Sequence, residues 1–315
     1  MRDGRGEFMS VLIVGSLAYD SVSSPAGSVE AALGGSATYG GLSCQFHLQR
    51  LGLAPATLVG VVGTDFADED RAVLANSGMD LSGLEVAEGA TFRWEGSYHG
   101  AMAEAETLAT HLNVFEHFQP QVPEHAKQPT VLFCANLHPA IQRNVMEQVD
   151  TARLAMLDSM NLWITIARDE LMDVMRMADL VIINDGEVRM LANDENVVTA
   201  MHALAEETNT TTLVVKRGEH GVLALHDGEF LALPAFPTAN LVDPTGCGDT
   251  FAGTLAACLA ASDGPLGMDE LRDALMMANV SASFTLESFG TQALSSLTSS
   301  AFDTRMDAYS RMLGR

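Results

Sequence analysis

The stretch Asn240-Leu-Val-Asp-Pro-Thr-Gly-Cys-Gly-Asp-Thr-Phe-Ala-Gly-Thr254 is the most informative part of this 315-residue sequence. It follows a predicted strand end and runs into a predicted helix of small residues over 250–261. Gly246 and Gly248 allow a sharp turn, and their N–H groups lie at the N-terminus of that helix, where anions bind favourably. The pattern therefore predicts an anion site made of main-chain amides.

Asp249 follows directly, at the same end of the helix. A carboxylate beside a simple anion store would repel the anion. It has a use if it takes a proton from a hydroxyl that then attacks phosphorus, while the amides stabilise the transferred phosphoryl group. The alternative is a helix cap, since an acid in the first turn interacts well with the helix dipole.

The rest of the chain alternates between short apolar runs and helical patterns. The predicted strands are 11–15, 56–62, 131–135, 154–158, 180–184 and 212–216, and the predicted helices are 40–51, 68–77, 141–149, 168–177 and 197–207. Continuous apolar strands that alternate with helices indicate a parallel sheet covered on both faces, with ligands beyond the carboxyl ends of the strands. Residues 21–33 and 91–99 break this alternation and predict a small separate β-element.

Composition excludes several partners. With 41 acids against 17 bases the net charge is −24, which repels nucleic acid and anionic lipid and favours a surface adapted to high salt. No apolar run reaches the roughly 18 residues of a membrane span. The four cysteines show neither a CxxC pair nor metal-site spacing, so a reducing cytoplasm is expected.

The motif that begins at Asp243, Asp-x-Thr-Gly-x-Gly-Asp-Thr-Phe-x-Gly, closely resembles the C-terminal signature of the ribokinase (PfkB) family of sugar and nucleoside kinases. The resemblance implies an α/β fold with a ribokinase-like three-layer α/β/α core, a mostly parallel central sheet and a small β-lid. We expect one kinase domain over 9–315, with lid strands at about 17–33 and 90–112. Residues 1–8 are expected to be a disordered or tag-derived extension.

The resemblance also assigns roles to residues, with Asp249 as the general base. The amides of Gly246, Cys247 and Gly248 would form the anion hole, although the family more often has alanine where Cys247 stands. Asp20, which ends Gly15-Ser-Leu-Ala-Tyr-Asp20, would bind acceptor hydroxyls. The other implied acceptor ligands are Gly34, Gly35 and Ser36, with Tyr39 where many members have asparagine.

On the donor side the resemblance implies ATP and Mg²⁺, with Glu187 of Asn184-Asp-Gly-Glu187 acting on the magnesium through water. Asp243 and Thr245 would bind a monovalent cation, in particular K⁺. The implied nucleotide-binding residues are Asn184, Glu187, Lys216, Gly218, Gly221 and Asn279. Asp158 and Asn161 are candidates to face the phosphate donor or the substrate, and the alternative is a simple turn with Trp163 packed in the core. His99, His111 and Asn113 are candidates to reach the acceptor, and the alternative is that they are ordinary surface or core residues.

The predicted function is ATP-dependent phosphorylation of a primary alcohol on a small sugar. A nucleoside kinase on the same fold is the alternative, and a non-catalytic sugar- or nucleotide-binding protein is the second. A dinucleotide-dependent oxidoreductase is disfavoured, because the first strand lacks the GxGxxG turn. A homodimer through the lid is a further expectation.

Overall fold

The computed structural model describes residues 9–102 and 105–315, so the predicted extension over 1–8 lies outside the described residues. Within those ranges a nine-stranded main sheet has the order β13-β12-β11-β10-β9-β8-β1-β4-β5. Strands β11 to β5 in this order are parallel, and β12 runs antiparallel to both of its neighbours. The strands of this sheet are β1 (Val11–Val14), β4 (Thr57–Gly63), β5 (Asp80–Ala87), β8 (Val131–Cys134), β9 (Leu154–Asp158), β10 (Leu180–Asn184), β11 (Thr212–Lys216), β12 (Val222–His226) and β13 (Glu229–Leu233).

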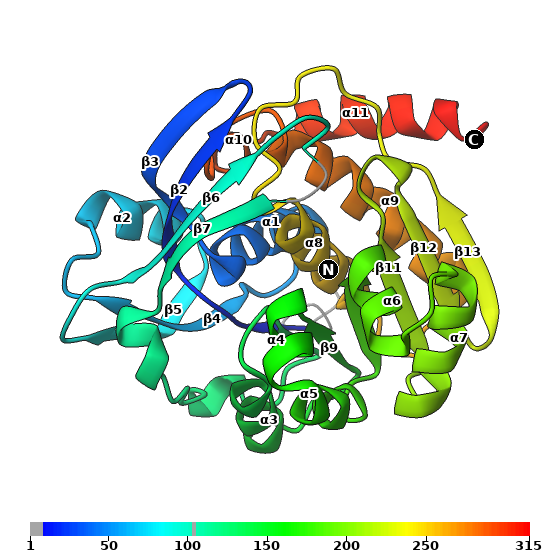
Figure 1. The fold of residues 1–315 in the computed structure, drawn as a ribbon, viewed down its shortest axis with the longest axis horizontal. Helices are drawn as coiled ribbons and strands as arrows, with labels where there is room; N and C mark the ends of the chain where they lie inside the picture. Colours follow the sequence, from blue (N-terminus) through cyan, green and yellow to red (C-terminus); the bar gives the residue numbers. More distant parts are fainter. Residues whose placement is uncertain (1–8, 103–104) are drawn as a thin grey trace, which may run out of the picture.

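Helices cover both faces of the main sheet (Figure 1). They are α1 (Ser36–Leu51), α2 (Asp68–Asn76), α3 (Pro139–Gln148), α4 (Asn161–Ile166), α5 (Arg168–Met175), α6 (Asp185–Ala192), α7 (Val197–Thr208), α8 (Cys247–Leu259), α9 (Met268–Thr285), α10 (Gln292–Ser295) and α11 (Ser299–Met312). Short 3-10 helices are η2 (Asn113–His117), η3 (Glu124–Ala126) and η4 (Gly218–His220).

Strand β1 shows how the sheet divides the core. Val11 and Ile13 pack in one buried cluster with α1, α8 and α9, whereas Leu12 and Val14 pack in the other with α3, α5 and α7. Alternate side chains of a strand point to opposite faces, so a strand covered on both sides must be apolar throughout. The predicted fold class, a three-layer α/β/α core with a mostly parallel sheet, is therefore confirmed.

A separate four-stranded sheet has the order β3-β2-β6-β7 within the described ranges. Its strands are β2 (Ala18–Ser24), β3 (Gly27–Gly34), β6 (Phe92–Tyr98) and β7 (Ala105–His111). We call it the small sheet. Asp65, just beyond β4, accepts hydrogen bonds from the N–H and hydroxyl of Thr91 at 2.7 Å each and from Arg93 at 2.8 Å. These contacts tie the start of β6 to the exit of the main sheet.

Helix α8 begins at Cys247 and packs closely against α1. A Cβ on Gly253 would lie 2.0 Å from the carbonyl oxygen of Gly40, so this crossing requires glycine. Helix α1 starts at Ser36, four residues earlier than the helical pattern predicts, and this extra turn places Tyr39 beside the start of α8. In Figure 1, α8 lies between the small sheet and the β9–β11 part of the main sheet.

Within the described ranges, no helix combines the length and hydropathy that crossing a membrane would require. Cys44 and Cys134 are buried, whereas Cys247 and Cys258 are half-buried, and all four are free thiols. Cys258 contacts Met277 at the edge of the core.

Candidate active site

The loop before α8 is held in place by α9. The N–H groups of Val242 and Asp243 donate to the carbonyl oxygen of Leu286 at 2.8 and 3.1 Å, and the hydroxyls of Thr250 and Thr285 lie 2.9 Å apart. Gly246 caps the helix with φ +77°, a left-handed conformation that glycine adopts without strain. The predicted turn at the N-terminus of a helix is therefore present.

The amides of this turn differ from the prediction at one position. The N–H of Cys247 donates to the carbonyl oxygen of Pro244 at 3.1 Å, which removes it from the predicted anion hole. Tight turns of this kind are common at helix ends and satisfy amides that the helix leaves free. The N–H groups of Gly246 and Gly248 have no such partner among the described residues, so they remain for an anion.

Asp249 lies in the first turn of α8 and is half-buried, so its carboxylate is not sealed in the core. Burial and the negative charge of Asp158 raise its pKa from 3.8 to about 6, although the Lys216 ammonium acts in the opposite direction. A carboxylate with a pKa near 6 is ionised at neutral pH, and it is basic enough to accept a proton from a hydroxyl group.

Tyr39 and Asp20 lie on one side of the turn. A Cβ on Gly246 would lie 2.3–2.5 Å from atoms of the Tyr39 ring, so the ring packs flat against the turn. A Cβ on Gly34 would lie 1.9 Å from Oδ2 of Asp20, so the predicted acceptor residues Asp20 and Gly34 are in contact. The negative charges of both Asp20 and Asp249 act on the Tyr39 hydroxyl.

Asp20 is 5% exposed. Burial raises its pKa to about 7, the Gly35 N–H opposes this by donating to the carboxylate, and Asp249 and Asp243 raise it further. Burial also raises the pKa of Tyr39, whose hydroxyl has no hydrogen-bond partner among the described residues. The site therefore holds a buried carboxylate close to a hydroxyl that has no hydrogen-bond partner among the described residues.

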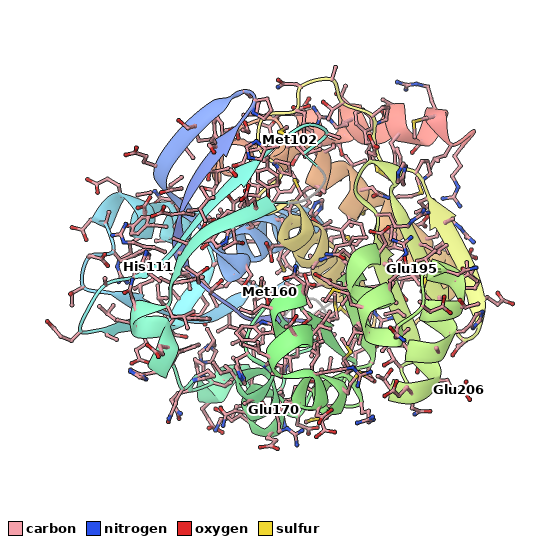
Figure 2. All side chains as sticks on the ribbon, viewed as in Figure 1. Met102, His111, Met160, Glu170, Glu195 and Glu206 are labelled. Carbon is pink, nitrogen blue, oxygen red and sulfur yellow. The ribbon has the colours of Figure 1, made fainter. Side chains whose placement is uncertain are left out.

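The small sheet contacts the loop before α8 directly. The Ser24 hydroxyl donates to the carbonyl oxygen of Val242 at 2.7 Å, and Thr245 Oγ1 donates to the Tyr98 hydroxyl at 3.3 Å. Tyr98 belongs to an apolar cluster with Val22 and Met102, against which Trp94 and Phe289 pack. Figure 2 shows Met102 beyond the end of β6, on the side of the small sheet toward α10.

Lys216, at the end of β11, lies on the other side of the turn. Its Nζ donates to both carboxylate oxygens of Asp158 at 2.9 and 3.1 Å. A Cβ on Gly248 would lie 3.1 Å from this Nζ, so the ammonium is adjacent to the second glycine of the anion site. Met160, which follows Asp158 and precedes α4, lies near the centre of the view in Figure 2.

Asn184 and Glu187 form a capping box at the start of α6. The Asn184 side chain accepts from the Glu187 N–H at 2.8 Å, and Glu187 accepts from the Asn184 N–H and amide group at 2.7 Å each. Burial raises the pKa of Glu187 to about 7 against the effect of Lys216. Both residues therefore stabilise the helix start while lying beside the charged group around Lys216.

Asp243 and Thr245, the predicted cation ligands, lie beneath the turn. Asp243 Oδ1 accepts from the Thr245 N–H at 2.9 Å, and Oδ2 is buried without a partner at full hydrogen-bond geometry among the described residues, although the nearby Gly290 N–H opposes the rise in pKa that burial causes in this carboxylate. An unpaired buried carboxylate oxygen fits a bound cation. In the part of the chain that the structure describes, no three His, Cys, Asp or Glu side chains form a metal-binding group.

Other predicted site residues have different surroundings. The Ser36 hydroxyl bonds with Ser16, and the Asn279 amide donates to the Tyr309 hydroxyl at 3.2 Å, between α9 and α11. Gly218 is the first residue of η4, shortly after Lys216, and Gly221 directly follows η4. His99 and His111 are exposed on the small sheet, and Figure 2 shows His111 at its far end.

Sequence reasoning missed Tyr98 and Asp65 as parts of the site's support. Tyr98 lies in the predicted 91–99 strand, but nothing local to it indicates the contact with Thr245. Asp65 ends the stretch Val59-Gly-Val-Val-Gly-Thr-Asp65, just beyond β4, and nothing in the local sequence indicates its partners. Its carboxylate instead anchors the small sheet.

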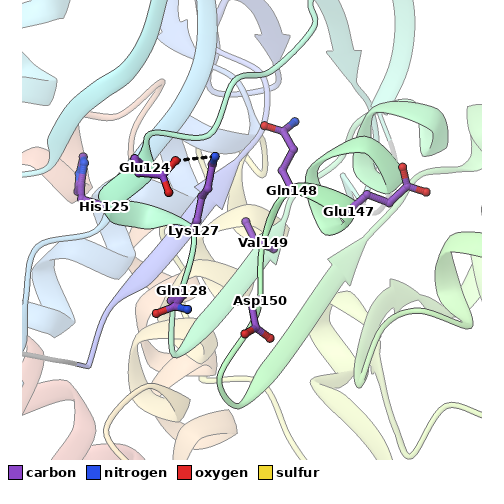
Figure 3. Close-up of a pocket in the computed structure, with 8 residues that line it drawn as sticks. All are labelled: Glu124, His125, Lys127, Gln128, Glu147, Gln148, Val149 and Asp150. Atoms are coloured by element: carbon purple, nitrogen blue, oxygen red, sulfur yellow. Dashed lines mark hydrogen bonds and ion pairs between the residues drawn. The ribbon is translucent and has the colours of Figure 1, made fainter.

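A surface hollow of about 650 Å³ lies elsewhere, between η3 and the end of α3 (Figure 3). It contains an ion pair of 2.7 Å between Lys127 and Glu124. None of the predicted site residues lines it. The lining is Glu124, His125, Lys127, Gln128, Glu147, Gln148, Val149 and Asp150.

Comparison with known proteins gives a family match and several relatives. Residues 10–298 match the model described as pfkB family carbohydrate kinase. Cytidine kinase from Thermococcus kodakarensis is 27% identical over 255 residues, which cover 79% of this chain and 88% of that protein. Bifunctional HldE proteins from Pseudomonas species also match, but the matched regions span only 25% to 53% of their length.

Solved structures share the fold. The nucleoside kinase of Burkholderia thailandensis in complex with inosine superimposes with a TM-score of 0.76 at 18% identity, over 95% of this chain and 97% of that chain. An Escherichia coli protein described as a ribokinase II, in complex with ATP and Mg²⁺, gives 0.73 at 20% identity, over 95% of this chain and 99% of that chain. At these identities the likeness establishes the ribokinase-like fold alone.

Proposed function

Because this chain belongs to the pfkB family of carbohydrate kinases, which transfer a phosphoryl group to an alcohol, we propose that it phosphorylates the primary hydroxyl of a nucleoside with ATP as donor. The observation that carries the proposal is the position of Asp249. This half-buried residue is next to the amides of Gly246 and Gly248, which have no backbone partner among the described residues, with Asp20 on one side and Lys216 on the other.

The proposed reaction follows from these positions. Asp20 accepts hydrogen bonds from acceptor hydroxyls, and Asp249 takes the proton of the reacting hydroxyl. The hydroxyl oxygen forms a bond to the γ-phosphorus as the bond from that phosphorus to the bridging oxygen breaks, and ADP leaves. The amides of Gly246 and Gly248 stabilise negative charge on the group in transfer.

Mg²⁺ and a monovalent cation fit the residues present. Magnesium in kinase sites is held largely by substrate phosphates and water, with one or two carboxylates, which agrees with the buried Glu187 near Lys216. When bound, Mg²⁺ neutralises charge on the donor phosphates. The unpaired Oδ2 of Asp243, with Thr245, is the proposed K⁺ site.

The apolar cluster of the small sheet favours a nucleoside over a free sugar. Tyr98 lies close enough to Asp20 for that carboxylate to raise its pKa, and it packs with Met102 in the cluster that Trp94 and Phe289 join. A hydroxyl ligand next to aromatic side chains suits a ribose that carries a base. The names of the Thermococcus kodakarensis and Burkholderia thailandensis relatives support the same class.

A small free sugar is the second candidate, since Asp20 needs only hydroxyl groups as partners. Acceptor-dependent ADP release from ATP, measured with matched nucleosides and pentoses, separates the two candidates. We expect a nucleoside to give the higher kcat/KM. A preference for free pentoses would overturn the acceptor class, and ligand binding without ADP release would favour a non-catalytic binding protein.

Asp249→Asn tests the chemistry. It should leave folding and ATP binding intact and lower kcat by roughly 10²–10⁴-fold, the usual contribution of a general base. Asp263→Asn is a matched control, because Asp263 is exposed between α8 and α9. Near wild-type turnover in Asp249→Asn would contradict the proposed role.

A further inference from the structure

The ion pair between Lys216 and Asp158 joins the ends of two strands of the main sheet. Asp158 ends β9 and is 2% exposed, and the Lys216 side chain at the end of β11 is 19% exposed. Asp158 also accepts from the N–H of Ser159 at 2.8 Å. Taking such a pair out of water offsets much of its attraction, so stability alone is a weak reason for it.

The ammonium of Lys216 lies within a group of carboxylates. Burial lowers the pKa of Lys216, but Asp158, Glu187 and Asp249 more than offset this, and the net shift is upward. The Lys216 ammonium therefore stays charged at neutral pH. An ammonium has three N–H donors, and hydrogen bonds to Asp158 account for two of them.

The remaining donor capacity is beside the anion site. The Nζ of Lys216 would be 3.1 Å from a Cβ on Gly248, whose amide has no backbone partner among the described residues. The acceptor hydroxyl must lie within reach of Asp249, one residue further along α8. The group that passes to that hydroxyl therefore lies between the α8 N-terminus and Lys216.

We propose that Lys216 supplies the positive charge that meets the transferred γ-phosphoryl group, and that Asp158 is a positioning residue that holds the ammonium beside Gly248. This inference rests on the proposed kinase function and gives a specific role to Asp158, which the sequence suggested only as a residue facing the phosphate donor or the substrate. Lys216 would stabilise charge that grows as the γ-phosphoryl group leaves ADP. The remainder of the nucleotide would not depend on it.

A comparison of the affinities for AMP-PNP and ADP separates this role from a structural one, because AMP-PNP keeps three phosphates and ADP lacks the third. By titration calorimetry, Lys216→Met should weaken AMP-PNP binding by about 10-fold, as expected for one hydrogen bond to a charged group, while ADP affinity changes by less than about twofold. Turnover should fall on the order of 10²-fold, and Lys216→Arg should recover part of it.

Asp158→Asn should give a different pattern. Neutralising the carboxylate frees the ammonium to bind phosphate, so AMP-PNP affinity should be equal or higher, while kcat falls by about 10-fold because the charge is no longer held in place. Lys127→Met is the matched control, since Lys127 is the other lysine of the chain and pairs with exposed Glu124 in the separate hollow of Figure 3. It should change neither affinity nor turnover.

Equal weakening of AMP-PNP and ADP by Lys216→Met would overturn the inference, and so would unchanged affinity for both. If Lys216→Met unfolds because Asp158 is left unpaired, the double variant Lys216→Met/Asp158→Asn removes both charges and carries the same test. Neither of the two binding measurements requires an alcohol acceptor. Absence of acceptor-dependent ADP release in the wild type would therefore reject the proposed function without deciding the role of Lys216.

Discussion

The free energy of unfolding of the Asp20→Asn variant, measured relative to wild type, should increase as the pH rises. The carboxylate is 5% exposed, and burial raises its pKa from 3.8 to about 7. A raised pKa means that the folded state binds the proton more tightly than the unfolded chain, so stability falls as pH rises from 3.8 to 7. The interval from pH 5 to pH 7 covers about 2 pKa units, which corresponds to about 3 kcal/mol.

Urea unfolding at pH 5 and pH 8 measures this directly. The free energy of unfolding of Asp20→Asn, relative to wild type, should increase by about 2–3 kcal/mol between the two pH values. Asp65→Asn is the control: the hydrogen bonds from Thr91 and Arg93 outweigh burial and lower the pKa of Asp65, so its effect should not vary above pH 5. A difference for Asp20→Asn that does not grow with pH would refute the account of this carboxylate.

Three further outcomes are expected. The kcat/KM should fall as the pH drops from 7 to 5, because Asp20 and Asp249, with pKa values of about 7 and 6, must be ionised to act; a flat profile would contradict both roles. Gly246→Ala should destabilise far more than Gly52→Ala in thermal melts: both glycines have positive φ, at a strain of about 1–2 kcal/mol, but only at Gly246 would the methyl group overlap the Tyr39 ring. Choline chloride should raise the thermal midpoint by screening the net charge of −24, and KCl should raise it further through Asp243; equal effects would argue against the cation site.

The strand ends were predictable because buried parallel strands have a simple apolar pattern. The runs that end at Asp158, Asn184 and Lys216 became β9, β10 and β11, which are neighbours in the sheet, with Asn184 directly opposite Lys216. The polar residues after these runs therefore had to lie at one edge. The turn at Gly246 was predictable for a similar reason, since its glycines mark the conformation locally.

Contacts between distant segments could not be read in the same way. The ring of Tyr39 lies under Gly246 only because α1 and α8 cross at Gly40 and Gly253. The hydrogen bond from Cys247 to Pro244 depends on how tightly the turn closes. Hydrogen bonding of Asn279 to Tyr309 requires the packing of α9 on α11, which no local pattern encodes.

The most direct test of the proposed chemistry is single-turnover phosphoryl transfer from ATP to a nucleoside by the Asp249→Asn variant, with enzyme in excess over ATP. Transfer should be slower by roughly 10²–10⁴-fold, while the affinity for ATP stays the same. Transfer at the wild-type rate would show that another group deprotonates the acceptor and that the arrangement around α8 has been misread.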